Sequence, residues 1–391
     1  AVGKCHWSFV LLSTDLLDVE RQRKRNDFLL ETLKPDFVVA DGTIAPDKLP
    51  AESIVTLDML ASYSGLTSDG LDEAADELMA LMCTGGSQRL KIVKVTHAMI
   101  VSEQRAYFDL CRPSLKNFTN SPRTLQHHLS FWPAAVLGQL SLAVALQGTA
   151  VVCSASEDLR TTVVQEDIHV LGLVPDQLRL LVEDPPSSLR IVLTWAERLP
   201  WHLADQWTRR TWKHCALYEV LIATEYWLSF VRRFDDDRVS RGSLQLFRPV
   251  STDVDFCVLD EDGSVMTEGL GELCLAGPMV TTGYWNPQKS ELPWVEVNGI
   301  RLFRTGDVVF LAKKGGFSYR GRKDRTTKVQ GQWLELRPLE ESLQDLEGIR
   351  EACIIEDGGS LYAFLVPECH RATDLLRCME IFKRVRQMLP W

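Results

Sequence analysis

The 391-residue chain lacks the features that mark several large classes of protein. Its ten cysteines include no CxxC pair, so their scattered spacing points to small core side chains rather than a zinc site or a disulfide framework. Repeats and low-complexity tracts are missing, and the formal net charge of −10 opposes a nucleic-acid groove, which needs clustered Lys and Arg. We therefore expect a globular cytoplasmic protein with no nucleic-acid partner.

The distribution of apolar residues also predicts neither a secretion signal nor a membrane span. The chain opens with AVGKCHWSFVLL, in which Lys4 and His6 break the apolar run. Residues 133–153 carry no charge and are about as long as a span, but they include Gln139 and a Gly-Thr pair at 148–149. This stretch predicts a buried helix followed by a short strand.

Most of the chain alternates short apolar runs with helical segments, a rhythm typical of α/β layers. A charged helix is expected at 18–33, between apolar runs at 8–12 and 37–40, and a second helix near 98–110. A polar, irregular connection is expected at 41–78. The later strands are predicted at 150–153, 168–174 and 190–194.

From about residue 244 the sequence pattern changes. Asp-Gly and Gly-Pro turns now separate short strands, which is typical of antiparallel structure. After Gly321 we expect a smaller unit with a helix near 338–346, a hairpin at 352–368 and an amphipathic helix at 372–388. The predicted domains are an α/β part at 1–240, a β-rich subdomain at 241–320 and a small mobile α+β domain at 321–391.

Three motifs carry a resemblance to a known family. They are GELCLAGPMVTTGYW (271–285), RLFRTGDVV (301–309) and GRKDRTTKVQGQWLEL (321–336). They are similar to the GELxIxGxxVxxGYW, YxTGD and GRxDxQVKxxGxxIEL motifs of the adenylate-forming superfamily. That superfamily comprises acyl- and aryl-CoA synthetases, luciferases and the adenylation domains of nonribosomal peptide synthetases.

Further segments fit the same order. CTGGSQRLKIVKVTH (83–97) resembles the family's TSGSTGxPKGVxVTH phosphate loop, LRIVLTWAERL (189–199) its LRxxxxGGExL, and IATEYW (222–227) its YGPTE. The resemblance covers almost the whole chain. By it, we expect the first portion of the large domain and the final catalytic lysine to lie outside this sequence.

The phosphate loop is implied to cradle pyrophosphate with Thr84, Ser87 and the amides beside Gly85 and Gly86, while Lys91 adds a point charge. The loop departs from the family, because Gln88, Leu90 and Ile92 replace two glycines and a proline. Losing glycines narrows the backbone conformations available to a loop. An ordinary surface turn therefore stays open as the alternative.

Other implied nucleotide contacts are carried over one by one. Asp307 would bind the ribose hydroxyls with both carboxylate oxygens, and Arg322 would reach the ribose or the phosphates. Glu225, following Thr224, would hold Mg²⁺, which accepts one or two carboxylates plus phosphate oxygens. The non-functional alternatives are a turn residue for Asp307, a solvated surface charge for Arg322 and a helix start for Glu225.

The segment after the third motif is implied to move. Asp324 corresponds to the hinge at which the small domain rotates between half-reactions, and Lys328 to a lysine that faces the active site for thiol transfer. A charged turn at 323–325 is the alternative.

Substrate choice is expected from HHLSFWPAA (127–135). Amino-acid-activating members carry an aspartate after the phenylalanine, whereas here Trp132 follows Phe131. An α-ammonium would be desolvated without a partner, so a neutral-tailed or aryl carboxylic acid fits better. His127 and His128 could line the carboxylate end, and Trp132 could instead plug the pocket.

These residues together indicate ATP- and Mg²⁺-dependent activation of a carboxylic acid as an acyl-adenylate. The acyl group would pass to CoA or to the phosphopantetheine of a carrier-protein domain in the same polypeptide. The alternative is a degenerate adenylation domain kept as a scaffold, supported by Trp195-Ala196 in place of Gly-Gly and Leu221-Ile222 in place of Tyr-Gly. A P-loop NTPase does not fit, because GGSQRLK lacks the GK[ST] ending.

Overall fold

The structure is a computed structural model. It describes residues 8–12, 19–36, 38–40, 54–56, 78–84, 91–116, 118, 120–129, 132–153, 157–211, 213–234, 246–285, 293–313, 315–323, 326–329, 332–336, 339–340, 343, 349–357 and 360–367. The chain divides into two compact units. Unit one comprises Ala1–Gln245, Pro249–Val254 and Gly277–Leu292; unit two comprises Leu246–Arg248, Asp255–Ala276 and Pro293–Trp391.

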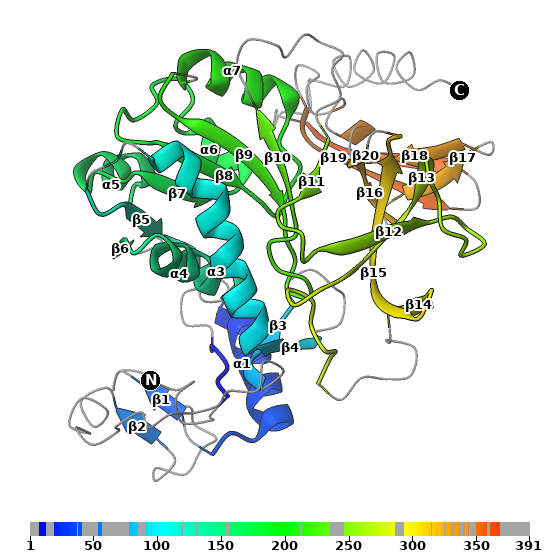
Figure 1. Ribbon diagram of the computed structural model, residues 1–391, viewed down its shortest axis with the longest axis horizontal. Helices are drawn as coiled ribbons and strands as arrows, with labels where there is room; N and C mark the ends of the chain where they lie inside the picture. The colour runs from blue at the N-terminus through cyan, green and yellow to red at the C-terminus, as the bar shows by residue number, and fades with distance from the viewer. Residues whose placement is uncertain are drawn as a thin grey trace. The chain divides into compact units, whose positions relative to one another are not determined.

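A seven-stranded sheet runs in the order β11-β10-β9-β8-β7-β5-β6, and all of it except Arg248 of β11 belongs to unit one (Figure 1). Its strands are β5 (Arg123–Gln126), β6 (Thr149–Val152), β7 (Val170–Leu173), β8 (Ile191–Thr194), β9 (Ala216–Leu221), β10 (Phe230–Phe234) and β11 (Arg248–Pro249). The run from β6 to β9 is parallel, and β10 is antiparallel to β9. Parallel strands need helical crossovers, which the intervening segments supply.

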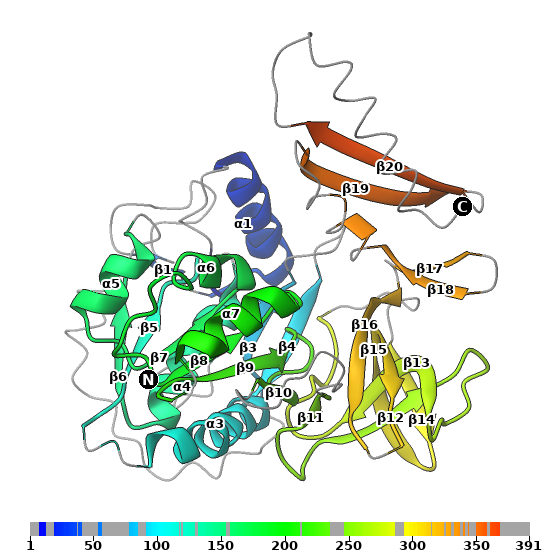
Figure 2. The ribbon, with the colours of Figure 1, turned by 90° about the horizontal axis from the view of Figure 1, so that it is seen from above.

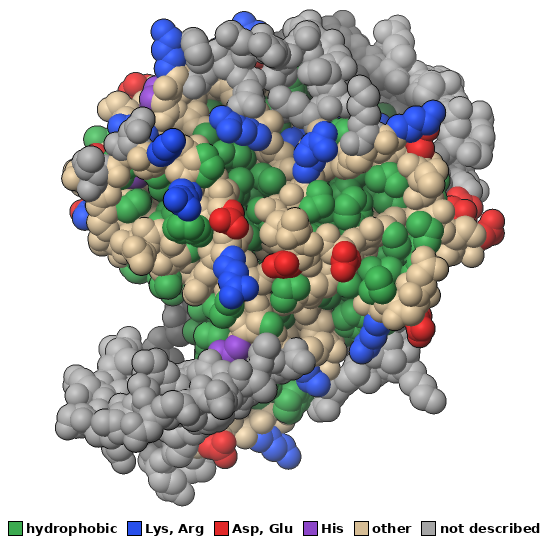
Figure 3. Space-filling view, in the orientation of Figure 1, with side chains coloured by type: hydrophobic (Ala, Val, Ile, Leu, Met, Phe, Trp, Pro, Cys, Tyr) green, Lys and Arg blue, Asp and Glu red, His purple; other side chains and the backbone are tan. Residues whose placement is uncertain are grey.

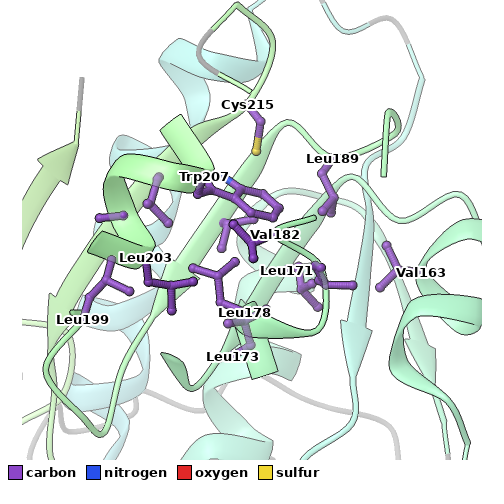
Figure 4. Packing of buried hydrophobic residues seen from close by; sticks show 14 of the residues in the cluster. Val163, Leu171, Leu173, Leu178, Val182, Leu189, Leu199, Leu203, Trp207 and Cys215 are labelled. Carbon is purple, nitrogen blue, oxygen red and sulfur yellow. The ribbon is translucent and has the colours of Figure 1, made fainter. Parts of the chain in front are cut away.

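Five helices accompany this sheet: α3 (His97–Cys111), α4 (Pro133–Ala145), α5 (Leu159–Gln165), α6 (Pro175–Arg179) and α7 (Trp201–Thr211). Alternate strand residues face opposite sides. Leu171 and Leu173 join a core with Leu178 of α6 and Trp207 of α7, which Figure 4 shows. Val170 joins a second core with α3 and α4 side chains. The central strands are therefore fully buried between two helical layers, as their continuous apolar runs require.

A smaller part of unit one surrounds the β3–β4 hairpin. It comprises α1 (Val19–Leu33), the parallel pair β1 (Val38–Ala40) and β2 (Ile54–Thr56), and the antiparallel pair β3 (Leu78–Cys83) and β4 (Ile92–Thr96). Leu29 of α1 packs with Leu81, Cys83 and Ile92 of the hairpin. This packing fixes the two strands that flank the predicted phosphate loop.

Unit two contains an antiparallel sheet in the order β12-β13-β15-β14, with β16 paired to β15 (Figure 2). Its strands are β12 (Asp255–Leu259), β13 (Gly269–Ala276), β14 (Trp294–Val297), β15 (Ile300–Leu311) and β16 (Phe317–Arg322). The later hairpins are β17 (Thr326–Val329) with β18 (Gln332–Glu335), and β19 (Ile349–Asp357) with β20 (Ser360–Pro367). Leu343 and Ile354 form the small core beneath the last hairpin.

The expected α/β layers are confirmed, and so is the antiparallel texture after residue 244. The uncharged stretch forms α4 and then β6, as its polar interruptions predicted. Residues 8–12 make one isolated bridge, Phe9 to Ala80, instead of a strand, and residues 54–56 form a strand inside the expected irregular connection. The predicted helix at 372–388 lies outside the described residues, and most of the helix at 338–346 does as well.

The predicted domain boundaries near 240 and 320 stay a prediction. The compact units divide the chain differently, because the described residues 277–285 belong to unit one. Within the described residues, no helix is long and apolar enough to cross a membrane. On the face drawn in Figure 3, Lys and Arg side chains of the described residues are dispersed among apolar and neutral surface.

Candidate functional site

The base of the predicted phosphate loop is an ordered hairpin end. The backbone N–H of Thr84 donates to the carbonyl of Lys91 at 3.0 Å, directly after the Cys83–Ile92 strand pair. The Thr84 hydroxyl oxygen is buried, and no described residue hydrogen-bonds to it. A buried hydroxyl with no protein partner is costly unless a ligand satisfies it. Gly85, Gly86 and Ser87 lie outside the described residues.

Lys91 and Glu225 approach the same aromatic side chain. The Lys91 Nζ lies 5.2 Å from the ring centroid of Tyr284, and the Tyr284 hydroxyl donates to Oε1 of Glu225 at 3.0 Å. Thr224 and Glu225 sit in the bend between β9 and β10, so the expected alternative of a helix start at this position is wrong. The fold thus brings together two predicted ligand residues that are far apart in sequence.

Sequence reasoning did not single out Tyr284. The signal was available, because Tyr284 falls in the GYW ending of the first family motif. What the sequence could not supply was the pairing of this segment with β4, through which Trp285 N–H donates to the Ile92 carbonyl at 2.7 Å.

A second cluster lies where the parallel strands end, the edge at which open α/β sheets bind ligands. His127 follows β5, and its Nε2 donates to the Gly172 carbonyl at 2.9 Å. The Gln139 side chain donates to the same carbonyl at 2.7 Å and accepts from the His127 backbone N–H at 3.1 Å. The indole N–H of Trp195 donates to Nε2 of His128 at 3.1 Å.

Both histidines are held in the neutral form. Burial lowers the pKa of His127, and burial together with the neighbouring His127 lowers the pKa of His128 to about 3. The cluster therefore offers polar groups without a positive charge at neutral pH. Trp132 is 44% exposed at the start of α4, and Phe131 lies outside the described residues.

Unit two holds a separate polar group around Asp307. This carboxylate is only 2% exposed, in β15, and its cross-strand neighbour is Arg322 of β16. Oδ1 accepts from the Tyr319 hydroxyl at 3.2 Å and from Nη1 of Arg322 at 3.4 Å. Arg322 also donates to the Thr305 carbonyl at 2.6 Å, so one end of its guanidinium is held at the site while the side chain stays 47% exposed.

Gly306 allows this arrangement. Its φ is +73°, and an added Cβ would lie 3.1 Å from Nη2 of Arg322. A side chain here would be strained and would press on the guanidinium. Because Oδ1 of Asp307 already accepts from two side chains, binding a ribose with both carboxylate oxygens would require these bonds to rearrange.

Glu272 organises the residue that precedes the predicted hinge. Its carboxylate forms ion pairs with Arg304 and, at 3.3 Å, with Nζ of Lys323. Burial opposes ionisation of Glu272, but the hydrogen bond and charge of Arg304, followed by Lys323, outweigh it and lower its pKa. Asp324 lies outside the described residues, and of Lys328 only the strand backbone in β17 is described.

The donor set fits a nucleotide with its metal better than a protein-only metal centre. The described residues contain no cluster of three or more His, Cys, Asp or Glu side chains able to hold a metal ion. Mg²⁺ does not require such a cluster, because one carboxylate and phosphate oxygens suffice. The Thr84 hydroxyl, which has no hydrogen-bond partner among the described residues, precedes the loop that ends at Lys91 and is the observation that favours a phosphate ligand.

The fold resembles that of solved enzymes. It matches ATP-bound MatB from Rhodopseudomonas palustris with a TM-score of 0.71 and 18% identity, covering 93% of this chain and 75% of that one. It also matches O-succinylbenzoate coenzyme A synthetase (MenE) from Bacillus subtilis, in complex with AMP, with a TM-score of 0.69 and 20% identity over 92% and 74%. The expected adenylate-forming fold is therefore confirmed.

The family follows from the sequence match. The model of the AMP-binding enzyme family matches residues 11–285, and the chain belongs to this family. It is 32% identical over 249 residues to delta-poly-L-ornithine synthetase of Acinetobacter baumannii (strain AB307-0294), spanning 61% of this chain and 18% of that protein. It is 24% identical over 371 residues to tyrocidine synthase 3 of Brevibacillus parabrevis, spanning 90% of this chain and 6% of that protein.

Proposed function

We propose that this chain activates a carboxylic acid with ATP, forming an acyl-adenylate and releasing pyrophosphate. The observation that carries the proposal is the buried Asp307 of the RTGD motif with Arg322 and Tyr319 around it. A buried carboxylate held by a cation is an expected acceptor for ribose hydroxyls. Family membership supports the same reaction.

The roles in unit one follow from the chemistry of phosphate. Attack by the acid on the α-phosphorus builds negative charge on phosphate oxygens, which positioned cations and donors stabilise. Lys91 and the Thr84 hydroxyl would hold these oxygens, with Glu225 and the neighbouring Thr224 on the Mg²⁺ side. Mg²⁺ would neutralise part of the phosphate charge when bound.

Transfer to a thiol is the second half of the proposal. The acceptor would be CoA or the phosphopantetheine of a carrier-protein domain in the same polypeptide. The matched relatives favour a carrier domain, because several of them are nonribosomal peptide synthetases. A solved relative, described as an adenylation domain artificially fused to a PCP, favours a carrier protein as the acceptor. Asp324 as hinge and Lys328 as the residue facing the thiol belong to this proposal.

The substrate would be a carboxylic acid with an uncharged tail. Neutral His127 and His128 at the carboxyl edge provide no charge to pair with a second ionic group. By the family resemblance, Trp132 would take the position of the carboxylate that pairs with an α-ammonium. Burying an unpaired charge is strongly unfavourable, so α-amino acids are disfavoured.

The test is ATP binding with Mg²⁺ by titration calorimetry. Asp307→Ala and the near-isosteric Asp307→Asn should each weaken ATP binding by about tenfold or more, since they remove a charged acceptor. Asp255→Ala is the matched control, because Asp255 is an exposed carboxylate on β12 of the same sheet. Equal affinity in all four proteins would refute the role of Asp307.

The alternative is a degenerate domain retained as a scaffold. It is favoured by the altered phosphate loop and by Leu221-Ile222 in place of Tyr-Gly. Failure of the unaltered chain to bind ATP, with a cooperative unfolding transition still present, would support this alternative over the enzyme.

A further inference from the structure

One aromatic residue links the two predicted ligand residues of unit one. Tyr284 is 7% exposed, so its ring and hydroxyl are largely shielded from water. Its ring faces the Lys91 ammonium at 5.2 Å, and its hydroxyl donates to Oε1 of Glu225 at 3.0 Å. Both contacts are charge-assisted, and shielding from water strengthens them.

The backbone on the β4 side fixes the ring beside Lys91. Tyr284 forms an antiparallel bridge with Val93. On either side of it, Lys94 N–H donates to the Gly283 carbonyl at 3.0 Å and Trp285 N–H donates to the Ile92 carbonyl at 2.7 Å. These bonds set the position of Tyr284 along the strand that Lys91 precedes.

The same segment is also bonded to the turn that carries Glu225. The Thr281 backbone N–H donates to the Glu225 carbonyl at 2.9 Å, and Val280 bridges Tyr226. The Thr281 hydroxyl donates back to the Lys94 carbonyl at 2.6 Å. Residues 280–285 therefore connect β4 to the Glu225 turn through backbone and side chain together.

We propose that Tyr284 is a positioning residue that couples the metal carboxylate Glu225 to the phosphate-binding Lys91. This inference rests on the proposed function of those two residues. Donation by the hydroxyl to Oε1 fixes the rotation of the carboxylate, which gives the second oxygen a defined direction for Mg²⁺. The ring independently orders the long Lys91 side chain before phosphate arrives.

The two contacts can be separated by substitution. Tyr284→Phe keeps the ring and removes the hydroxyl, so it should raise the apparent Kd for Mg²⁺, measured at saturating ATP, about tenfold. Its Kd for ATP in EDTA should change less than twofold. Tyr284→Leu also removes the ring and should weaken ATP binding in EDTA about threefold. Tyr218→Phe, another buried tyrosine of unit one, is the control and should change neither constant.

A double-mutant cycle distinguishes positioning from a structural role. In Glu225→Gln the carboxylate is absent, so adding Tyr284→Phe should raise the Mg²⁺ Kd less than twofold further. The inference is overturned if Tyr284→Phe leaves the Mg²⁺ Kd unchanged, if it shifts the ATP and Mg²⁺ constants equally, or if the cycle is additive. No ATP binding by the unaltered chain in either buffer would instead overturn the proposed function, and this inference with it.

Discussion

Glu103 should make the stability of unit one depend on pH in a direction unusual for a carboxylate. It lies in α3 and is fully buried, with the Tyr107 hydroxyl and Ser141 of α4 as polar neighbours. Burial raises its pKa from the ordinary value of 4.5 to about 8, and the nearby Tyr107 and Ser141 hydroxyls oppose this only in part, since neither carboxyl oxygen has a hydrogen-bond partner among the described residues. The folded protein therefore retains the Glu103 proton at neutral pH.

The sign and size follow from proton linkage. A carboxyl group whose pKa is raised on folding contributes its full stability below pH 4.5, and that contribution is lost as pH rises toward 8. Each pH unit within this window is worth ~1.4 kcal/mol. Between pH 5 and pH 7.5 the loss should be about 3 kcal/mol.

Glu103→Gln removes the titration while keeping the shape of the side chain. The free energy of unfolding can be measured by urea unfolding followed by tryptophan fluorescence. Between pH 5 and pH 7.5 it should fall by about 3 kcal/mol less in the variant than in the unaltered chain. The control is Glu183→Gln, because the Glu183 side chain is 79% exposed and pairs with Arg210 at the surface. Parallel pH profiles for Glu103→Gln and the unaltered chain would refute the reasoning.

Two further predictions concern Trp195 and its neighbours. An added Cβ at Gly172 would lie 1.8 Å from the Trp195 indole, so Gly172→Ala should cost about 3 kcal/mol of unfolding free energy. In a Trp195→Ala background the same change should cost less than ~1 kcal/mol, which a double-mutant cycle in urea measures. Ala196 is exposed and has φ +67°, a backbone conformation that glycine adopts at lower cost than alanine. Ala196→Gly should therefore raise the free energy of unfolding by about 0.5–1 kcal/mol. A destabilised Ala196→Gly would contradict this.

The local pattern of apolar residues was sufficient to predict helices and strands that are buried along their whole length. The helix and strand within 133–153 were predictable, because Gly148 ends a charge-free helical run and four strand residues follow. Central strands such as β7 and β8 also followed from short apolar runs, since strands covered on both faces have no polar alternation. Residues 8–12 have a similar run but lie in a single bridge, because pairing depends on a distant partner.

Motifs in the sequence identified several residues of the candidate site, but they did not identify the contacts between those residues. Asp307 and Arg322 were named from sequence, and the register of β15 and β16 places them opposite each other. Tyr284 and Glu272 were missed, because their partners are far along the chain: Tyr284 is 59 residues from Glu225, and Glu272 is 51 from Lys323. Neither separation has a periodicity that a single sequence reveals.

Trp195-Ala196 stands where the family has Gly-Gly, and this replacement disturbs the turn after β8 less than the change of residue type suggests. Ala196 retains the left-handed φ that a glycine would adopt, so the turn after β8 keeps its backbone path at a modest energetic cost. The Trp195 indole in turn packs onto Gly172 of β7, where no larger residue would leave room, and donates to His128. A substitution that only accumulated damage would leave the indole N–H unsatisfied and the ring without room. The paired small residue and the hydrogen bond instead accommodate the bulky Trp195 side chain at this edge of the sheet, so Trp195 is not by itself a sign of a decayed site.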